Sequence, residues 1–527
     1  MEGYDARIEW LSIASFGAGL VERGQGRRPR ATCYAYLIGQ GKKERLTFWL
    51  SLLSLYVGCS VNMAEYDLTQ TLVAHLDPHL VLPLLSHLRT LDLFDAKDVA
   101  KAQYEVSKKT NMTDYALQLF KEAYPGEAEP KEITERANEM EAKNEKLAKE
   151  AEHVLKVIED PMVAGSLKQD KAQNFEWLKQ QYQLTEEQIH VLYEYGRFRF
   201  ACGKYSEASS YLYHYSVLSP DTGKVYESVL WGKLASNTLT GEWERALEDL
   251  RVLREHIDSQ RASTSSVNVS DEHQLSHEYI LQKRVWLLHW SLFVFFNHPA
   301  GRVKLVEMFL SQSYLNAIQM SCWWLLRYLV VALIVTRRQC TRGYVVECGS
   351  YSHTSKLQTH AALQELSKVI QMEAYRLRPD PFVDFFRQLY VELDFERAQE
   401  ELAKAQRVAR ADFFLHDTAD VFMEQARLLV SEVYCRIHQK VDIGDLSERL
   451  VLSKEEGEQW VAKLLNETKL DATIENGVLY MNQPRPIVYQ SVIDKARGLT
   501  GHTTSLMQAI ERRTQQPLDM EEAAEAK

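Results

Sequence analysis

Two cysteines and two histidines in the middle of the chain are the residues that most resemble a metal site. Cys340, Cys348, His353 and His360 are separated by seven, four and six intervening residues. Zinc fingers present their ligands in closely spaced pairs, and this arrangement contains no such pair. We therefore expect these four residues to bind no metal.

The sequence also lacks the motifs that carry the common catalytic chemistries. It contains no P-loop, no HExxH helix, no Gly-x-Ser-x-Gly turn and no HxH…SxxD motif of the deubiquitinating MPN subunits. His277-Glu278 has no second histidine four residues after the first, and Phe16-Gly17-Ala18-Gly19 has no strand–helix–strand context for a dinucleotide. We expect no enzyme, no cofactor and no small-molecule substrate.

An aromatic-rich run at 286–298 could be read as a cofactor box. Trp286, Trp290 and Phe293 are spaced so that one face of a helix carries all three, which favours a buried core helix. On that interpretation His289 and His298 are hydrogen-bonded core or turn residues and bind no ligand.

The composition is that of an ordinary folded protein. The 527 residues are 45% hydrophobic and carry a net charge of −11, which disfavours a protein that coats nucleic acid. A chain of this length predicts about three or four domains. Seven scattered cysteines without a CxxC pair indicate a reduced, intracellular protein.

Residues 1–62 differ from the rest of the chain. Their apolar run, 46–61, is shorter than the roughly 20 residues of a spanning helix and begins too late for a cleaved signal. We expect an atypical extension that is disordered or belongs to an upstream leader, with the protein's start at Met63. We expect no membrane anchor and no association with a membrane.

From Met63 the pattern is helical, and two motifs predict repeats. Gly203-Lys204-Tyr205-Ser206-Glu207-Ala208 and Gly241-Glu242-Trp243-Glu244-Arg245-Ala246 share Gly-x-aromatic-x-x-Ala, 38 residues apart, and the aromatic-x-x-Ala part returns at Phe395 and Ala398. The glycine ends one helix, the aromatic ring packs on a neighbour, and the alanine allows close approach. A period in the mid-thirties is typical of TPR-like solenoids.

A charged segment before these repeats carries a heptad pattern. Spacings of four and three alternate through Ile133, Ala137, Met140, Asn144, Leu147, Ala151, Val154 and Ile158. The pattern leaves two alternatives open: this helix packs on helices of its own chain, or it pairs with a partner.

Residues 436–483 have the order of a winged helix: a short strand at 441–443, two helices, and a hairpin. The hairpin is predicted from Asn476-Gly477, because a type I′ turn requires positive φ at both central positions. Ser453 and Glu456 form a capping box for the second helix. The predicted core and cap residues are Leu446, Leu450, Ser453, Glu456, Trp460 and Leu464.

Winged helices bind DNA or other proteins, and charge decides between the two here. Residues 436–482 carry six positive and nine negative side chains, and the second helix begins Lys454-Glu455-Glu456-Gly457-Glu458. Duplex binding requires phosphate neutralisation, so this helix favours protein pairing through an open strand edge. The interface candidates are Asp471, Thr473, Ile474, Val478 and Tyr480 near the hairpin, with Val488, Val492 and Leu499 in a C-terminal helix after Pro484 and Pro486.

Several long motifs resemble one family. Leu230-Trp231-Gly232-Lys233-Leu234-Ala235-Ser236, the run from Trp286 to Pro299, Tyr314-Leu315-Asn316-Ala317-Ile318-Gln319, Asp412-Phe413-Phe414-Leu415 and Cys435-Arg436-Ile437-His438-Gln439 look like the e-subunit family of eukaryotic translation initiation factor 3. The resemblance covers about residues 63–510. It departs at 339–361, where about 23 residues rich in Gly, Ser, Thr and Cys form an insert, either a surface loop or a retained intron.

The resemblance implies a non-catalytic PCI-domain scaffold that supports the 43S pre-initiation complex and mRNA recruitment to the 40S subunit. Its implied partners are the PCI and MPN subunits of initiation factor 3 and the 40S subunit, and it contacts mRNA only indirectly. The implied localisation is the cytoplasm, with a minor nuclear pool. The alternative is a PCI scaffold subunit of the proteasome lid or the COP9 signalosome.

The expected fold is mainly α: a right-handed helical-repeat (TPR/HEAT-like) solenoid, then the winged helix of a PCI domain, then a C-terminal helix. The expected domains are the extension 1–62, a helical-repeat domain 63–250, a PCI domain 251–483 with helical part 251–435 and winged helix 436–483, and a C-terminal helix with acidic tail 484–527.

Overall fold

A computed structural model describes residues 66–91, 94–128, 130–158, 184–218, 225–263, 274–337, 355–372 and 379–444, with individual residues in 177–182, 457–481 and 492–510. The extension 1–62, most of the insert 339–361, and Cys340, Cys348 and His353 lie outside these residues. His360 lies in a helix, but its side chain is outside the described part. The chain divides into unit 1, Met1–Arg427, and unit 2, Leu428–Lys527.

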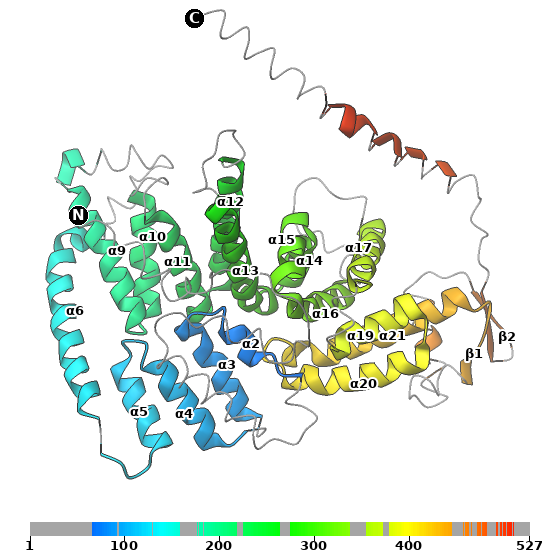
Figure 1. The fold of residues 1–527 in the computed structure, drawn as a ribbon, viewed down its shortest axis with the longest axis horizontal. Coiled ribbons are helices and arrows are strands. Elements are labelled where there is room, and N and C mark those ends of the chain that lie inside the picture. The colour runs from blue at the N-terminus through cyan, green and yellow to red at the C-terminus, as the bar shows by residue number, and fades with distance from the viewer. Residues whose placement is uncertain are drawn as a thin grey trace, which may run out of the picture. The chain divides into compact units, whose positions relative to one another are not determined.

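Unit 1 opens with a row of short helices, blue in Figure 1. They are α2 (Thr69–Val73), α3 (Pro78–Thr90), α4 (Ala96–Ser107) and α5 (Thr113–Ala123). Asp77 and Asp95 cap α3 and α4 by accepting backbone N–H bonds, and Pro78 occupies the first turn of α3, where its missing N–H costs nothing. The row buries Leu85, Val99 and Ala102 in a shared core.

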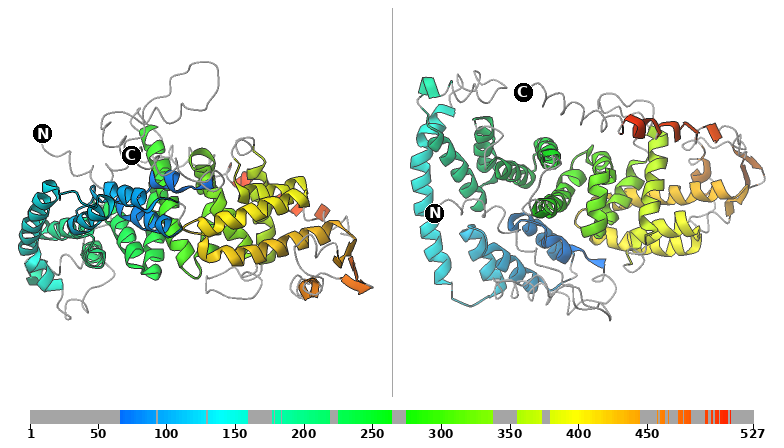
Figure 2. Two further views of the ribbon diagram at one scale, coloured as in Figure 1. Left: turned by 90° about the horizontal axis from the view of Figure 1, so that it is seen from below. Right: turned by 45° about the horizontal axis from the view of Figure 1, so that its top comes forward.

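The heptad segment forms one long helix, α6 (Lys131–Ile158), at one end of unit 1. In Figures 1 and 2 it lies beside α9 and α5, which both contact its inner side. Leu147 and Ala151 of the seam are buried against Tyr195 and Phe198 of α9. Arg199 donates to the Oδ1 of Asn144 at 3.3 Å. The first alternative is therefore correct: the seam packs on its own chain.

The second row of helices contains the repeats. It comprises α9 (Glu186–Ala201), α10 (Tyr205–Leu218), α11 (Tyr226–Thr240), α12 (Trp243–Ser263) and α13 (Gln274–Asn297). Gly203 and Gly241 turn the chain with φ of +81° and +78°, and Ala208 and Ala246 are fully buried at the close contacts. The predicted roles of the glycine and the alanine are confirmed in both motifs.

The remaining helices of unit 1 continue this packing. They are α14 (Gly301–Leu310), α15 (Gln312–Ser321), η3 (Trp323–Leu325), α16 (Leu326–Thr336), α17 (Ser355–Ile370), α19 (Pro381–Arg387), the π-helix η4 (Gln388–Glu392), α20 (Phe395–Ala411) and η5 (His416–Thr418). Every residue of α16 is buried, which makes it the central helix of this part. Phe395 and Ala398 form a third repeat turn, with Leu393 where the other two have glycine.

Helix α21 (Ala419–Ile437) begins in unit 1 and ends in unit 2. Unit 2 then holds a three-stranded sheet of β1 (Lys440–Asp442), β2 (Ala472–Glu475) and β3 (Val478–Met481), in the order β1-β3-β2. Gly477 has φ +78° in the predicted hairpin. The described residues at 457–465 and 492–510 are helical.

The fold class is confirmed: the chain is mainly α, a helical-repeat solenoid followed by the sheet of a winged helix and a C-terminal helix. In the described part of the chain, no single helix has the length and hydropathy of a membrane span. Only the pair Gln312–Ser321 and Trp323–Thr336, bent by 120°, meets those criteria together.

Candidate subunit interface

The sheet of unit 2, which we call the wing sheet, is held by two antiparallel pairings. Lys440, Val441 and Asp442 of β1 lie opposite Tyr480, Leu479 and Val478, and Thr473 and Ile474 of β2 lie opposite Tyr480 and Leu479. Strand β3 is therefore central. The backbone edges on which a partner strand can add belong to β1 and β2.

Directly paired residues share a face of a sheet, so the register sorts the side chains. Val441 and Leu479 are buried, which identifies the inner face. Ile474 is on the same face but 50% exposed, because β2 is the edge. Lys440, Tyr480 and Thr473 form a row on the outer face, with the Lys440 ammonium 5.3 Å from the Tyr480 ring centre.

The predicted interface residues near the hairpin lie partly on the outer face of the wing sheet and partly at its β2 edge. Thr473, Val478 and Tyr480 share the outer face, and Ile474 is exposed at the edge. Val478 and Tyr480 lie in the central strand, whose backbone is paired on both sides. A partner could therefore contact only their side chains. Asp471 and Val488 lie outside the described residues. The interface assignment itself stays a prediction.

The predicted winged-helix core is described only in part. Trp460 is half-buried and its indole N–H donates to the Ser431 hydroxyl at 3.2 Å, while Val461 beside it is buried. The other five core and cap residues, Leu446, Leu450, Ser453, Glu456 and Leu464, lie outside the described residues.

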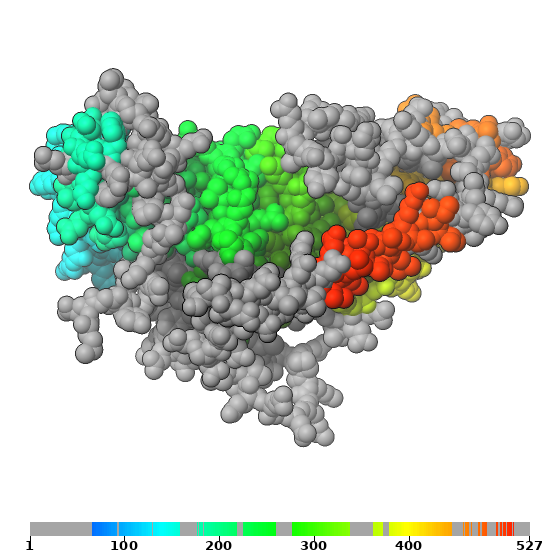
Figure 3. All heavy atoms as spheres, turned by 90° about the horizontal axis from the view of Figure 1, so that it is seen from above, coloured from blue at the N-terminus to red at the C-terminus, as the bar shows by residue number. Residues whose placement is uncertain are grey.

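The helical residues between 492 and 510, which we call the C-terminal segment, expose their apolar side chains. Val492, Leu499, Leu506 and Ile510 are 57, 68, 64 and 63% exposed. Together with Ala496 and Thr503, they recur at spacings of four and three, which is the heptad pattern of a helix that packs lengthwise on another. Figure 3 shows the atoms of this segment in red on the surface. The sequence reasoning found Val492 and Leu499 and missed Leu506 and Ile510, although the same spacing contains them.

No candidate catalytic or metal centre emerges from the side chains that the structure describes. Groups of three or more His, Cys, Asp and Glu that could hold a metal are absent among them. His289 and His298 have the roles expected of core and turn histidines: His289 is buried and accepts from the Trp324 indole at 3.0 Å, and His298 accepts from the N–H of Ala300 at 3.1 Å.

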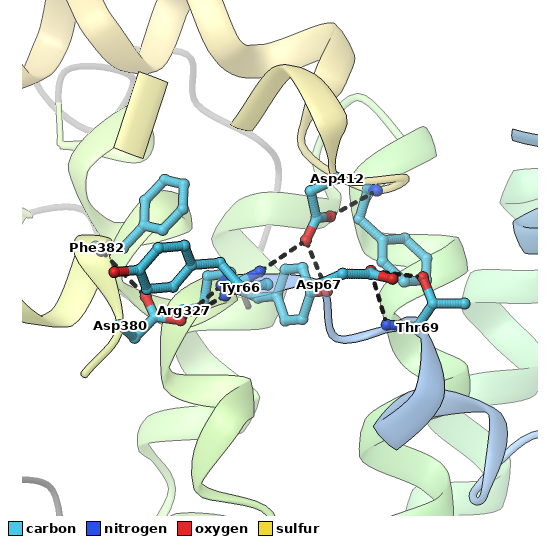
Figure 4. A network of polar contacts seen from close by, with 9 residues as sticks. Tyr66, Asp67, Thr69, Arg327, Asp380, Phe382 and Asp412 are labelled. Carbon is cyan, nitrogen blue, oxygen red and sulfur yellow. Dashed lines mark hydrogen bonds and ion pairs between the residues drawn. The ribbon is translucent and has the colours of Figure 1, made fainter. Parts of the chain in front are cut away.

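Unit 1 contains a buried charge network that the sequence reasoning missed, which we call the Arg327 junction (Figure 4). Arg327, on α16, is 2% exposed and lies between Asp380 at 2.7 Å and Asp412 at 3.3 Å. Its guanidinium also donates to the backbone carbonyl of Tyr66 at 2.8 Å, and the Tyr328 hydroxyl donates to Asp412 at 3.1 Å.

Each charge in the junction is balanced by its neighbours. Burial would lower the pKa of Arg327, but Asp380 and Asp412 outweigh it and raise the pKa above its ordinary value. Burial raises the pKa of Asp412, and Arg327 partly offsets that rise. The network therefore holds four segments that are distant in sequence: the residues before α2, helix α16, the turn around 380 and the turn around 412.

Helices α2 and α3 are attached beside this network by ring contacts. His75 stacks on His289 of α13 with ring centres 4.3 Å apart, and its carbonyl accepts from the Trp290 indole at 3.2 Å. His87 lies 4.8 Å from the ring of His416. A signal for the junction was present in the sequence, because Arg327 is a lone charge in the apolar run 325–335 and a buried charge requires partners.

Comparison with known proteins gives two family matches and a set of relatives that align along most of the chain. The family model described as "eIF3 subunit 6 N terminal domain" matches residues 67–199, and the PCI domain matches residues 389–483. A Mycosarcoma maydis protein, named as the E subunit of eukaryotic translation initiation factor 3, is 50% identical over 473 residues, which cover 86% of this chain and 87% of that protein. Proteins of the same name from Emericella nidulans and Aspergillus clavatus are 41% and 40% identical over 436 residues, which cover 82% of this chain and 91% of each.

Proposed function

The chain belongs to the E-subunit family of eukaryotic translation initiation factor 3, and from this premise we propose that it is a non-catalytic scaffold in that multi-subunit factor in the cytoplasm. Its role is to hold other subunits in place, so that the assembled factor supports the 43S pre-initiation complex and mRNA recruitment to the 40S subunit. RNA is reached through the complex, and the acidic balance of residues 436–482 supports that view.

The observation that carries the proposal is the C-terminal segment. Four large apolar side chains at heptad positions are more than half exposed. An apolar stripe of this kind on a helix is stabilised when a partner helix covers it, and each side chain covered contributes about 1.5–3 kcal/mol. We assign the covering helices to neighbouring PCI and MPN subunits of the factor.

The wing sheet offers a second contact. The outer edge of β2 carries exposed Thr473 and Ile474, and backbone hydrogen bonds from a partner strand would extend the sheet there. Two contacts of different geometry, one helical and one strand-based, suit a subunit that joins several neighbours.

The proteasome lid and the COP9 signalosome use scaffolds of the same architecture and are the alternative assignment. The names of the relatives favour initiation factor 3, because proteins named as its E subunit align along more than four fifths of this chain.

Two substitutions on the C-terminal segment test the proposal. Leu499→Asp with Leu506→Asp places two carboxylates on the exposed stripe, and we expect co-purification of the other subunits to fall about tenfold or more. Both side chains are exposed, so the fold of the chain is expected to keep its stability.

The control is Gln508→Asp, which adds one carboxylate to the opposite side of the helix and is compared with each single variant, Leu499→Asp and Leu506→Asp, as well as with the double variant. It is expected to leave co-purification unchanged. Equal recovery of the other subunits with the double variant and with the control would rule out the C-terminal segment as the contact.

A further inference from the structure

The third repeat turn of unit 1 breaks the rule that the first two obey. Gly203 and Gly241 occupy the left-handed position two residues before the aromatic residue of their repeats, with φ of +81° and +78°. Leu393 occupies the equivalent position before Phe395, with φ +58°. Within the described residues it is the only non-glycine with positive φ.

Leucine at this turn costs backbone energy. A left-handed conformation places Cβ against the following carbonyl, and glycine avoids this steric strain because it has no Cβ. The backbone around Leu393 is otherwise satisfied, since the N–H of Asp394 donates to the carbonyl of Gln388 at 2.9 Å and closes the π-helix η4. The geometry of the turn therefore requires a left-handed residue and gives no reason for that residue to be leucine.

Packing within the chain does not explain the leucine either. Its side chain is 48% exposed, so burial returns only part of its apolar contribution. Tyr390 and Val391, which precede it in η4, are also partly exposed, and the Tyr390 ring is stacked on Phe386 at 4.7 Å, which holds it in place. Tyr390, Val391 and Leu393 thus form a partly exposed apolar corner, with Leu393 its most exposed residue.

The sequence around this corner is acidic. Residues 384–404 carry six carboxylates against two guanidiniums and the ammonium of Lys404, which pairs with Glu401 at 2.7 Å. Both arginines are already engaged: Arg387 pairs with Asp384 at 2.7 Å and Glu392 at 3.4 Å, and Arg397 pairs with Asp394 at 3.4 Å. A partner that covers Leu393 must bring its own positive charges.

We propose that Leu393 is an anchor for another subunit of the same complex, and that it inserts into an apolar pocket bordered by lysine or arginine side chains. The strained turn presents the leucine outward, and the surrounding carboxylates select a basic partner. The inference rests on the proposed role in a multi-subunit complex, and it adds a contact separate from the wing sheet and the C-terminal segment.

Substitution by glycine separates an anchor from a structural leucine, because the two roles predict opposite signs. As an anchor, Leu393→Gly relieves the backbone, so the midpoint of thermal unfolding of the isolated chain stays equal or rises by about 1 °C. In the assembled factor the same variant is expected to weaken retention of one subunit about tenfold under a salt wash. A lower unfolding midpoint with unchanged retention would overturn the proposal.

A photo-cross-linker identifies the partner surface directly. With p-benzoylphenylalanine at position 393 in the assembled factor, we expect a cross-link to a peptide in which lysine or arginine flanks apolar residues. The control is the same probe at Tyr213 of α10, which is 54% exposed. A yield at 393 no higher than at 213, or a cross-link to an acidic peptide, would refute the anchor.

Two different results would contradict the proposed function and the Leu393 anchor. If the unmodified chain recovers no other subunit, the proposed function is wrong. If the unmodified chain recovers the full factor and the Leu393 variants behave like it, only the anchor is wrong.

Discussion

Arg327 connects several segments that are distant in sequence. Its guanidinium neutralises two buried carboxylates and binds a backbone carbonyl 261 positions away in sequence. Replacement by methionine keeps most of the volume but leaves Asp380 and Asp412 buried without a counter-charge. We expect Arg327→Met to lower the free energy of unfolding by about 3–5 kcal/mol, measured by urea denaturation.

The matched control removes the carboxylates as well. Arg327→Met combined with Asp380→Asn and Asp412→Asn no longer buries uncompensated charge, so we expect it to recover part of the lost stability. A single Arg327→Met variant as stable as the parent chain would show that the junction does not hold these segments.

Three buried histidines of unit 1 make the stability of the folded chain depend on pH. Burial lowers the pKa of His75 and of His79 to about 4, and lowers that of His289 as well. The unfolded chain takes up protons near pH 6.5, so acid favours unfolding in the window from about 6.5 down to about 4, by up to roughly 3 kcal/mol for each of the first two.

Buried carboxyls act in the opposite direction. Burial raises the pKa of Asp77 to about 6, so its protonation in the same window stabilises the folded chain. Because imidazoles whose pKa is lowered by burial (His75, His79, His87, His214 and His289) outnumber carboxyls whose pKa is raised by it (Asp77, Asp384 and Asp412), we expect the thermal unfolding midpoint to fall between pH 7 and pH 4.5. His75→Phe keeps a ring for stacking on His289 and is expected to reduce that fall; an unchanged pH profile would count against the assignment.

At the scale of elements, the ends of helices are set by glycines of two kinds. Gly241 needs only its left-handed φ of +78°, since a Cβ there meets nothing closer than 4.0 Å. Gly301 starts α14 where a Cβ would lie 2.3 Å from the carbonyl oxygen of Phe295. We expect Gly241→Ala to cost about 1 kcal/mol and Gly301→Ala clearly more, measured by chemical denaturation. Equal losses would contradict this ranking.

The sequence predicted the elements whose cause is local. The repeat turns at Gly203 and Gly241, the buried histidines of 286–298 and the hairpin at Gly477 each depend on the conformational freedom or spacing of a few neighbouring residues. The sequence did not decide whether the heptad seam of 133–158 packs internally, because the partner faces of α9 are more than 35 residues away.

The Arg327 junction was missed for a related reason. An arginine in an apolar run indicates that partners are needed, but Asp380, Asp412 and Tyr66 are brought together only by the tertiary fold. The left-handed Leu393 was missed because leucine carries no sequence signal for positive φ. The interface candidates at the wing sheet and in the C-terminal segment remain predictions, because an interface is defined only by the partner that binds it.

At the scale of the whole molecule, unit 1 is tied together from its first described residues to its last turns. The two family matches, 67–199 and 389–483, are separate in sequence. Nevertheless the junction joins Tyr66 to Asp412, and His87 contacts His416. Such closure suits the proposed scaffold role, because a subunit that holds several neighbours must itself keep a fixed shape.

The most direct test of the central claim is purification of the tagged chain from its own cells, followed by identification of everything that copurifies. We expect the other subunits of initiation factor 3 together with 40S ribosomal proteins. Recovery of proteasome-lid or signalosome subunits without 40S proteins would contradict the account.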